Sequence, residues 1–338
     1  MQGSRVRVHL ENYTSKPRVF WLTRDLLRAA RRENPDVARN VHFTVGDDLV
    51  DLEKNLRETV VLVTSSDVIR DPRFPRARLR DAAPRLELIH VIGAGVEGLL
   101  PLDWLPPRIK LTNNSGVHVR KAREFLLMSL LALNARLPAI VTNQRQARWE
   151  QLFTPSIEGR KLVVVGLGDM GRAAVAAGRA LRLRIAGVRR SARAVPGVAR
   201  IYPPDQLAIA LKDADLLVIA APLTAQSANL VNRTALAAMR RGAGIVNVGR
   251  AGLLDHEALC EFLRSGHLSG AILDVFAPEP LPASSPLWSA PNLIVNPHVS
   301  SDDSARYMAD TMGLVCRNVR RLLAQRPLEN VISASQGY

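Results

Sequence analysis

The stretch KLVVVGLGDMGRAAVAAGRALRL, residues 161–183, decides the fold of this chain. An apolar run at 161–166, typical of a buried strand, leads directly into the pattern Gly-x-Gly-x-x-Gly. A helical pattern follows at 170–181, and a second strand pattern, LRIAGV, follows at 183–188. The glycine pattern alone is weak, but a strand before it and a helix after it are the context in which such a turn binds a dinucleotide. The sequence therefore predicts a nucleotide-binding β-α-β unit here.

Each glycine of the motif has a physical task in this interpretation. Gly166 permits the tight turn, Gly168 lets the backbone approach a pyrophosphate, and Gly171 lets the helix and the strand pack closely. The first turn of the helix carries Asp169 and Met170, and its free N–H groups and positive dipole end favour phosphate charge. We therefore expect these five residues to line a cofactor site.

The end of the second strand indicates which dinucleotide binds. A unit that binds NAD usually places Asp or Glu here, on the ribose 2′-hydroxyl. The sequence instead reads GVRRS, with Arg189, Arg190 and Ser191 where the acid is expected. A guanidinium group binds a 2′-phosphate bidentately, whereas an acid would repel it. We predict NADP(H) as the preferred cofactor and NAD(H) as the alternative, and an ordinary solvated arginine pair is the competing interpretation.

Strand and helix patterns alternate along the rest of the chain as well. Strand patterns lie at 5–10, 41–45, 59–64, 86–92, 161–166, 183–188, 214–221, 243–248, 270–275 and 292–297, and helical patterns at 19–32, 122–137, 170–181 and 305–323. Such alternation predicts parallel sheets with helical crossovers. We expect an α/β protein with two Rossmann-like, doubly wound parallel-sheet domains and an interdomain cleft. One domain would comprise 1–112 plus 299–338, and the other, which binds the dinucleotide, 113–298.

Polar residues follow three later strands of the nucleotide-binding domain, namely Arg250, Glu279 and His298. Parallel sheets bind ligands at the carboxyl ends of their strands, so these side chains are expected to converge. His298 can protonate a carbonyl oxygen as hydride reaches the carbon, and Glu279 would stabilise the imidazolium. Arg250 can bind a carboxylate through two parallel hydrogen bonds and would polarise the carbonyl. Each residue alone is more often structural, but their ordered occurrence indicates reduction of a small 2-keto acid.

Residues at or beyond the strand ends are expected to complete the cofactor site. They are Ala221, Pro222, Val248, Gly249 and Asp274. No metal site is expected, because the two cysteines, Cys260 and Cys316, have no metal-ligand spacing. They also form no disulfide framework, which favours a reduced, cytoplasmic setting.

The 338-residue chain is basic, with a formal net charge of +15, which raises the question of nucleic acid. Its Arg and Lys residues are dispersed in short pairs, so no nucleic-acid partner is expected. The basic field favours small anionic substrates and cofactors instead. No apolar stretch reaches membrane-spanning length, and the N-terminal MQGSRVRVHLENY lacks the apolar core of a signal peptide. We therefore expect no membrane association.

Several segments together resemble the D-isomer-specific 2-hydroxyacid dehydrogenase family, over nearly the whole chain. They are GLGDMG (166–171), APLTAQSANLVNRTALAAMRRGAGIVNVGRAGLLD (221–255), LDVFAPEPLPASSPLW (273–288), NPHVSS (296–301) and VIGAGVEGLL (91–100). The resemblance implies a flavodoxin-like substrate domain and assigns the catalytic roles to Arg250, Glu279 and His298. It also implies that the N–H groups of Ala94 and Gly95 bind the substrate carboxylate, together with Arg250 and His298.

The GAGVE loop and the GVRRS strand end look most like the NADPH-linked reductases of 2-ketoacids, glyoxylate and hydroxypyruvate. That subgroup reduces the keto acid to a D-2-hydroxy acid. The segment NNSGVHVRKAREFLL (113–127) is similar to the family's entry into a long helix that supports dimer contacts, which implies a homodimer. Two departures stand out: Ala251 replaces a Gly, and Arg123, with Arg120 and Lys121 nearby, replaces an Ala before Glu124.

Two other functions stay open at this point. One is a nucleotide-sensing, corepressor-like protein on the same scaffold, because sensor relatives can retain the three catalytic residues. The other is a dehydrogenase of another small anion, of the formate or phosphite type, although formate-type relatives place Gln where Glu279 stands. Tyr13 and Trp21 are candidates for contacting substrate at the cleft edge, with core or surface packing as the competing interpretation.

Overall fold

Two sheets contain all the strands in the described part of the chain, residues 5–333 of the computed structural model. The chain divides into two units, one of Met1–Val117 with Asp303–Tyr338 and one of His118–Asp302. Every strand pairing within both sheets is parallel, which confirms the predicted α/β class. The unit boundaries lie a few residues beyond those expected from the sequence.

The sheet of the second unit has seven strands, in the order β12-β11-β10-β9-β6-β7-β8. Their bounds are β6 Lys161–Val165, β7 Arg184–Val188, β8 Arg200–Tyr202, β9 Leu216–Ile219, β10 Ala243–Asn247, β11 Leu268–Leu273 and β12 Leu293–Val295. Numbered within the unit and read from β8, the order is 3-2-1-4-5-6-7, the doubly wound arrangement of dinucleotide-binding domains. The strand order reverses between β6 and β9, and ligands of such sheets bind at that point.

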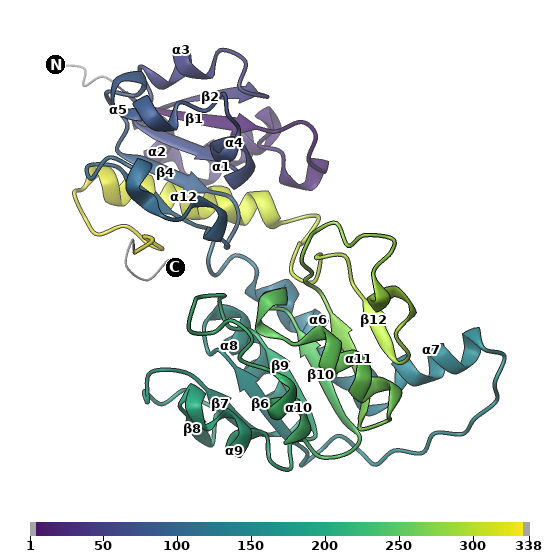
Figure 1. Ribbon diagram of the computed structural model, residues 1–338. Coiled ribbons are helices and arrows are strands. Elements are labelled where there is room, and N and C mark those ends of the chain that lie inside the picture. Colours follow the sequence, from purple (N-terminus) through teal and green to yellow (C-terminus); the bar gives the residue numbers. More distant parts are fainter. Residues whose placement is uncertain (1–4, 334–338) are drawn as a thin grey trace. The chain divides into compact units, whose positions relative to one another are not determined.

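Helices cover both faces of this sheet, which explains why its strands are almost continuously apolar. Along β6, Val163 and Val165 pack into one core, and Leu162 and Val164 pack into the other. The first core includes apolar side chains of α9, α10 and α11, and the second those of α6 and α8. These five helices are labelled in Figure 1. The helices are α6 Val119–Asn134, α7 Leu137–Arg145, α8 Asp169–Ala180, α9 Leu207–Leu211, α10 Arg233–Ala237 and α11 His256–Arg264.

The sheet of the first unit has five strands, in the flavodoxin-like order β2-β1-β3-β4-β5. Its strands are β1 Val6–Asn12, β2 Val41–Asp47, β3 Val61–Thr64, β4 Leu88–Val91 and β5 Lys110–Thr112. Its helices are α1 Arg24–Glu33, α2 Pro35–Asn40, α3 Leu52–Leu56, α4 Ser66–Arg70, α5 Leu79–Ala82 and α12 Tyr307–Leu323. The C-terminal helix α12, yellow in Figure 1, packs against α1 and α2 of this unit.

The structure differs from the sequence patterns mainly at short elements. The edge strands β5 and β8 have three residues each, too few to show a period, and neither was expected. The expected helix at 19–32 begins only at Arg24, because Thr23 caps it by accepting a hydrogen bond from Leu26 N. The 3-10 turns are Arg18–Phe20, Arg76–Arg78, Glu97–Leu99, Leu102–Trp104, Pro204–Gln206, Ala251–Leu253 and Pro286–Ser289.

Within residues 5–333, no helix is by itself long and apolar enough to cross a membrane. The pair α6 and α7 would meet the length and composition requirement jointly, but it is bent by 66° at its break.

Candidate active site

The glycine turn after β6 has the conformation that the motif requires. Gly166 has a φ of +87°, which L side chains rarely adopt, and a Cβ there would lie 2.5 Å from Ala221 Cα. A Cβ on Gly171 would lie 1.9 Å from the carbonyl oxygen of Gly166, so the helix can approach the turn only without a side chain. Gly168 caps α8, and a Cβ there would meet no atom within 4 Å. The open space beside Gly168, at a helix N-terminus, fits a pyrophosphate.

This turn lies at the point where the strand order reverses. Ala220 N donates a hydrogen bond to Val165 O at 2.8 Å, so the segment after β9 runs beside the end of β6. Val248 N likewise donates to Ile219 O at 3.0 Å, which brings the end of β10 to the same edge of the sheet. The predicted cofactor residues at this edge are Asp169, Met170, Ala221, Pro222, Val248 and Gly249.

The arginine pair follows β7, next to β6 in the sheet. Arg189 is half-buried, and its N–H donates to Tyr202 O of β8 at 3.0 Å. Arg190 and Ser191 are exposed. Ser191 Oγ accepts a hydrogen bond from Arg193 N at 3.3 Å, which orders the turn after the strand. The structure thus presents two guanidinium groups at the strand end where an acid would select NAD.

Arg250 is positioned by Asn247, a residue that the sequence analysis did not single out. Asn247 is fully buried at the end of β10, where its Oδ1 accepts from Gly249 N at 3.0 Å and its Nδ2 donates to Arg250 O at 3.1 Å. The guanidinium Nη1 of Arg250 donates to Gly249 O at 2.8 Å. Ala251, where the resemblance predicts Gly, does not have a positive φ, so its Cβ adds no backbone strain.

Glu279 and His298 lie together in the second unit, as the sequence suggested they would. His298 Nδ1 and Glu279 Oε2 are 2.7 Å apart, and Glu279 Oε1 accepts a hydrogen bond from Phe276 N at 2.8 Å. Because a carboxylate only accepts, Nδ1 carries a proton, and Nε2 is the ring atom that exchanges a proton with a ligand. The His298 side chain is 48% exposed, so a ligand can reach that atom.

His298 stands in a strained turn that Asp274 holds. Its φ of +54° is left-handed, and its N–H donates to Asn296 O at 2.9 Å. Asp274 is buried at the end of β11 and accepts from Val299 N at 3.0 Å and Ser300 N at 3.1 Å, and also from the side chains of Asn296 and Ser300. Burial raises the pKa of Asp274, whereas these hydrogen bonds and the nearby His298 charge lower it. Asp274 therefore anchors the histidine turn, a role beyond the cofactor contact expected of it.

A second histidine lies near the catalytic candidates, and the sequence analysis gave it no role. The imidazole of His118, just before α6, is 12% exposed, with Nδ1 at 3.5 Å from Ser301 O and 3.9 Å from Asp302 Oδ1. Burial lowers the pKa of His118, and the charges of His298 and Arg250 lower it further. Burial raises the pKa of Asp302. The surroundings of His118 therefore favour its neutral form.

The loop with Ala94 and Gly95 follows β4 in the first unit. Two asparagines that the sequence analysis did not single out hold its carbonyl groups: Asn113 Nδ2 donates to Ala94 O at 2.6 Å, and Asn114 N donates to Gly93 O at 3.0 Å. Within the described chain, no acceptor is found for the N–H groups of Ala94, Gly95 and Val96. A row of unused N–H groups suits a carboxylate. The pair of adjacent asparagines directly after a strand is the feature of the sequence from which these contacts could have been inferred.

Tyr13 and Trp21 use their polar atoms locally. The hydroxyl of Tyr13 donates to Asp71 Oδ2 at 2.8 Å, and the indole N–H of Trp21 donates to Lys16 O at 2.8 Å. These contacts favour packing over substrate binding. The unusual basic residues at the start of α6 lie at the surface, where Lys121 pairs with Glu124 at 3.0 Å and Arg120 and Arg123 are exposed.

Within residues 5–333, no group of three His, Cys, Asp or Glu side chains could hold a metal ion. A cavity of about 590 Å³ lies at the N-terminal ends of β4 and β5, opposite the edge that carries the loop with Ala94 and Gly95. It contains none of the predicted site residues and is lined by Glu87, Arg108, Lys110, Leu322, Gln325, Arg326, Pro327, Leu328 and Val331.

Residues 127–300, just over half of the 338-residue chain, match the NAD-binding domain of the D-isomer specific 2-hydroxyacid dehydrogenases. The chain belongs to this family. Its two parallel-sheet units are also those of solved dehydrogenases of the family. One from Aeromonas salmonicida has a TM-score of 0.80 and 28% identity, covering 98% of this chain and 100% of that one.

Two further relatives of this dehydrogenase have more specific names or bound ligands. One from Xanthobacter autotrophicus, solved in complex with NADPH and MES, has a TM-score of 0.80 and 27% identity over 99% of this chain and 100% of that one. The protein named glyoxylate/hydroxypyruvate reductase A from Salmonella paratyphi C is 27% identical over 76% of this chain and 83% of its own.

Proposed function

We propose that this dehydrogenase reduces a small 2-keto acid, of the glyoxylate or hydroxypyruvate class, to the D-2-hydroxy acid with NADPH. The observation that carries the proposal is the His298–Glu279 pair, at 2.7 Å, on the strand-end edge that also holds the glycine turn and Arg250. The names of the Salmonella reductase and of the NADPH-bound Xanthobacter protein support the substrate class and the cofactor.

The second unit would supply the acid, the electrophile and the cofactor site. The glycine turn would hold the pyrophosphate, and Arg189, Arg190 and Ser191 would hold the 2′-phosphate; NADPH, when bound, supplies the hydride. Protonated His298 donates its Nε2 proton to the carbonyl oxygen, and Glu279 keeps the ring oriented and balances its charge. Arg250 polarises the same carbonyl through the positive charge of its guanidinium group. In the reverse direction, neutral His298 accepts the hydroxyl proton.

The first unit would bind the substrate carboxylate. The N–H groups of Ala94 and Gly95 have the polarity for this task, and the asparagine contacts hold their loop in a fixed conformation. These N–H groups would select substrates that carry a carboxylate, such as 2-keto acids, over simple aldehydes and ketones.

A panel of 2-keto acids with NADPH and with NADH, followed by the loss of nucleotide absorbance, tests the proposal. We expect turnover of glyoxylate or hydroxypyruvate with NADPH, and a D-2-hydroxy acid as product. Tight NADPH binding without turnover of any keto acid would contradict the proposal and favour the nucleotide-sensing alternative. Oxidation of formate or phosphite would favour the other alternative.

The arginine pair gives the first specific prediction. Arg189→Asp should raise the KM for NADPH about 10- to 100-fold, because a charge-assisted contact is worth about 1.5–3 kcal/mol and the new carboxylate repels the 2′-phosphate. The KM for NADH should fall or stay unchanged, because the carboxylate can accept from the ribose 2′-hydroxyl. Steady-state kinetics with both cofactors measure the ratio. Arg193→Asp, a nearby exposed change, serves as the matched control, and an unchanged ratio in Arg189→Asp would mean that the pair is only solvated.

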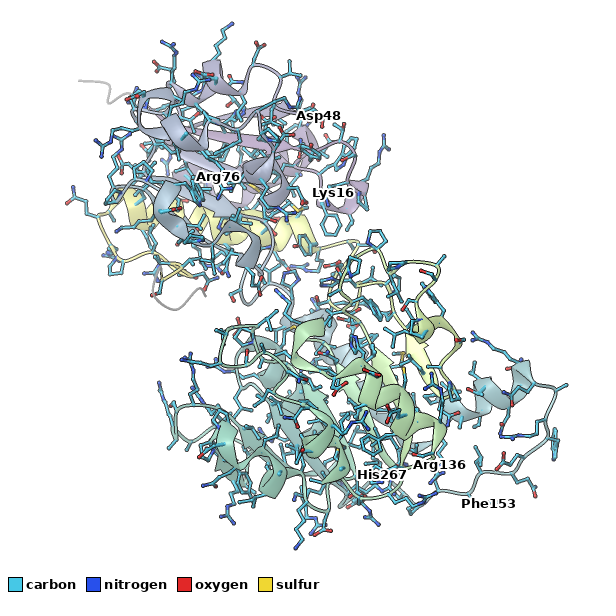
Figure 2. All side chains as sticks on the ribbon, in the orientation of Figure 1. Lys16, Asp48, Arg76, Arg136, Phe153 and His267 are labelled. Atoms are coloured by element: carbon cyan, nitrogen blue, oxygen red, sulfur yellow. The ribbon has the colours of Figure 1, made fainter. Side chains whose placement is uncertain are left out.

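We also propose that the dehydrogenase is a homodimer, formed through α6, α7 and the segment that follows them. Figures 1 and 2 show this segment swinging out from the body of the unit, with Phe153 on it, before the chain returns to β6. Residues 148–156 form no helix or strand, yet Trp149 is 93% and Phe153 86% exposed. The neighbouring helices add exposed apolar side chains, namely Met128, Leu131, Leu137 and Ile140. This amount of exposed apolar surface on α6, α7 and residues 148–156 is typical of an interface between protein chains.

Replacing Trp149 and Phe153 together by serine should therefore convert the dimer into a monomer at micromolar concentration. Light scattering on a sizing column measures the mass. Val50→Ser is the control, because Val50 is 67% exposed in the other unit and its replacement should leave the mass unchanged. A wild-type protein that is monomeric at high concentration would refute the proposal.

A further inference from the structure

A cluster of buried polar side chains lies directly behind the substrate loop of the first unit. It consists of His90 on β4, Thr112 at the end of β5, Asn114 after it and Thr311 on α12. All four residues have no exposed surface. Buried polar groups must be satisfied by one another, so the direction of each hydrogen bond can be worked out.

Asn114 fixes the direction of the network. Its Nδ2 donates to Ile92 O at 2.8 Å and to Thr311 Oγ1 at 2.7 Å, and a carbonyl oxygen can only accept. The other amide atom, Oδ1, must therefore be the one that faces His90 Nε2, at 3.3 Å. It follows that His90 Nε2 carries a hydrogen and donates it.

His90 is neutral in this position. Burial lowers the pKa of His90 to about 4, and its side-chain partners are Thr112 and Asn114, neither of which is charged. A neutral imidazole with its hydrogen on Nε2 has a bare Nδ1, which accepts from Thr112 Oγ1 at 3.0 Å. The chain of donors therefore runs from Thr112 through His90 to Asn114.

The end of this chain of donors is the backbone of the substrate loop. Asn114 donates to Ile92 O through its side chain and to Gly93 O through its N–H, and the hydroxyl of Tyr307 also donates to Ile92 O, at 2.6 Å. Both carbonyl groups are thereby turned into the protein. The next N–H groups along the chain, those of Ala94 and Gly95, are the ones left for a carboxylate.

We propose that His90 is a positioning residue, which acts through Asn114 to hold the loop at residues 92–95 in its carboxylate-binding conformation. The inference rests on the proposed function, in which this loop binds the substrate carboxylate. It assigns to a buried histidine, which takes no part in the proposed proton transfer, a measurable effect on substrate affinity.

Three replacements of His90 separate this role from simple core packing. Gln reaches as far as Nε2 and can donate to Asn114 Oδ1, whereas Asn reaches only as far as Nδ1, and Leu cannot donate at all. We expect His90→Leu and His90→Asn to raise the KM for the keto acid at least about tenfold, because a buried acceptor loses its donor. We expect His90→Gln to stay within about threefold of the wild type. In all three variants, kcat should change much less than KM, and the dissociation constant for NADPH should not change.

A matched control comes from the same sheet. His9 on β1 is equally buried, but it bonds to Glu11 at 2.8 Å and Thr44 at 2.8 Å and makes no contact with the loop. His9→Gln should lower thermal stability and leave the KM for the keto acid unchanged. Equal KM values in His90→Leu and the wild type would overturn the proposal, as would the same increase in His90→Gln as in His90→Leu.

Oxalate, a planar carboxylate that is not reduced, keeps the test independent of turnover. Calorimetric titration of oxalate into the NADPH-loaded protein should give weaker binding in His90→Leu than in His90→Gln, by the same factor as KM. If the wild type reduces no keto acid, the proposed function fails, and these oxalate affinities still decide the positioning role. Failure of the wild type to bind oxalate would overturn the positioning role.

Discussion

Replacing His298 by alanine should lower kcat for keto-acid reduction by about 10²–10⁴-fold and leave NADPH binding intact. A positioned general acid typically contributes this much, and Nε2 of His298 is the ring atom free to give a proton. NADPH binding should persist because the glycine turn and the arginine pair follow β6 and β7, whereas His298 follows β12 at the edge of the same sheet. Stopped-flow kinetics of reduction and fluorescence titration of NADPH measure the two quantities separately.

A second variant of His298 separates the loss of the proton donor from a change in the backbone of its turn. His298 has a φ of +54°, and Asn adopts this left-handed conformation more readily than most residues, so His298→Asn should preserve the turn that Asp274 anchors. It should nevertheless be as inactive as His298→Ala. His42→Ala is the control, because His42 is an exposed histidine on β2 and its loss should not affect the rate. A near-normal rate in His298→Asn would assign the acid to another group.

Replacing Arg250 by methionine should lower kcat/KM about 10²–10³-fold, because one preorganised donor to a developing oxyanion is worth this much. The turn itself should survive, since Asn247 holds the backbone of Gly249 and Arg250 and not the guanidinium. Arg250→Lys should recover only part of the loss in kcat/KM, because lysine keeps the positive charge but cannot donate two parallel hydrogen bonds.

Initial rates over a range of keto-acid concentrations measure the Arg250 effect. Arg241→Met is the matched control, because Arg241 is exposed just before β10, at the opposite end of the same strand. A loss confined to KM, with kcat unchanged, would show that Arg250 binds the ground state only. Equal kcat/KM in Arg250→Met and the wild type would remove it from the site.

The conformation of the glycine turn could be predicted because the information that determines it is local. Gly166, Gly168 and Gly171 act within one turn, and the strand and helix that flank them are long enough to show their periods. The proximity of Glu279 and His298 could also be predicted, because both follow neighbouring parallel strands, which end at the same edge of the sheet. The roles of these residues in catalysis remain predictions.

The positioning residues could not be predicted because their partners are distant in sequence or depend on backbone direction. Asn114 meets Thr311 on α12, nearly two hundred residues away in the chain. The role of Asn247 becomes apparent only from the turn that it caps. The sequence NPHVSS likewise gives no indication that His298 has a left-handed φ. Asp274 was expected to touch the cofactor, and its contacts with the histidine turn depend on strand register.

Each unit has hydrophobic cores of its own, two around the seven-stranded sheet and two around the five-stranded one. The residues proposed to choose the nucleotide and those proposed to grip the keto acid therefore belong to separately packed modules. Substitutions after β7 would change cofactor preference, and substitutions around β4 would change acid preference. Because the two segments share no core, a protein engineer can expect the two effects to be additive.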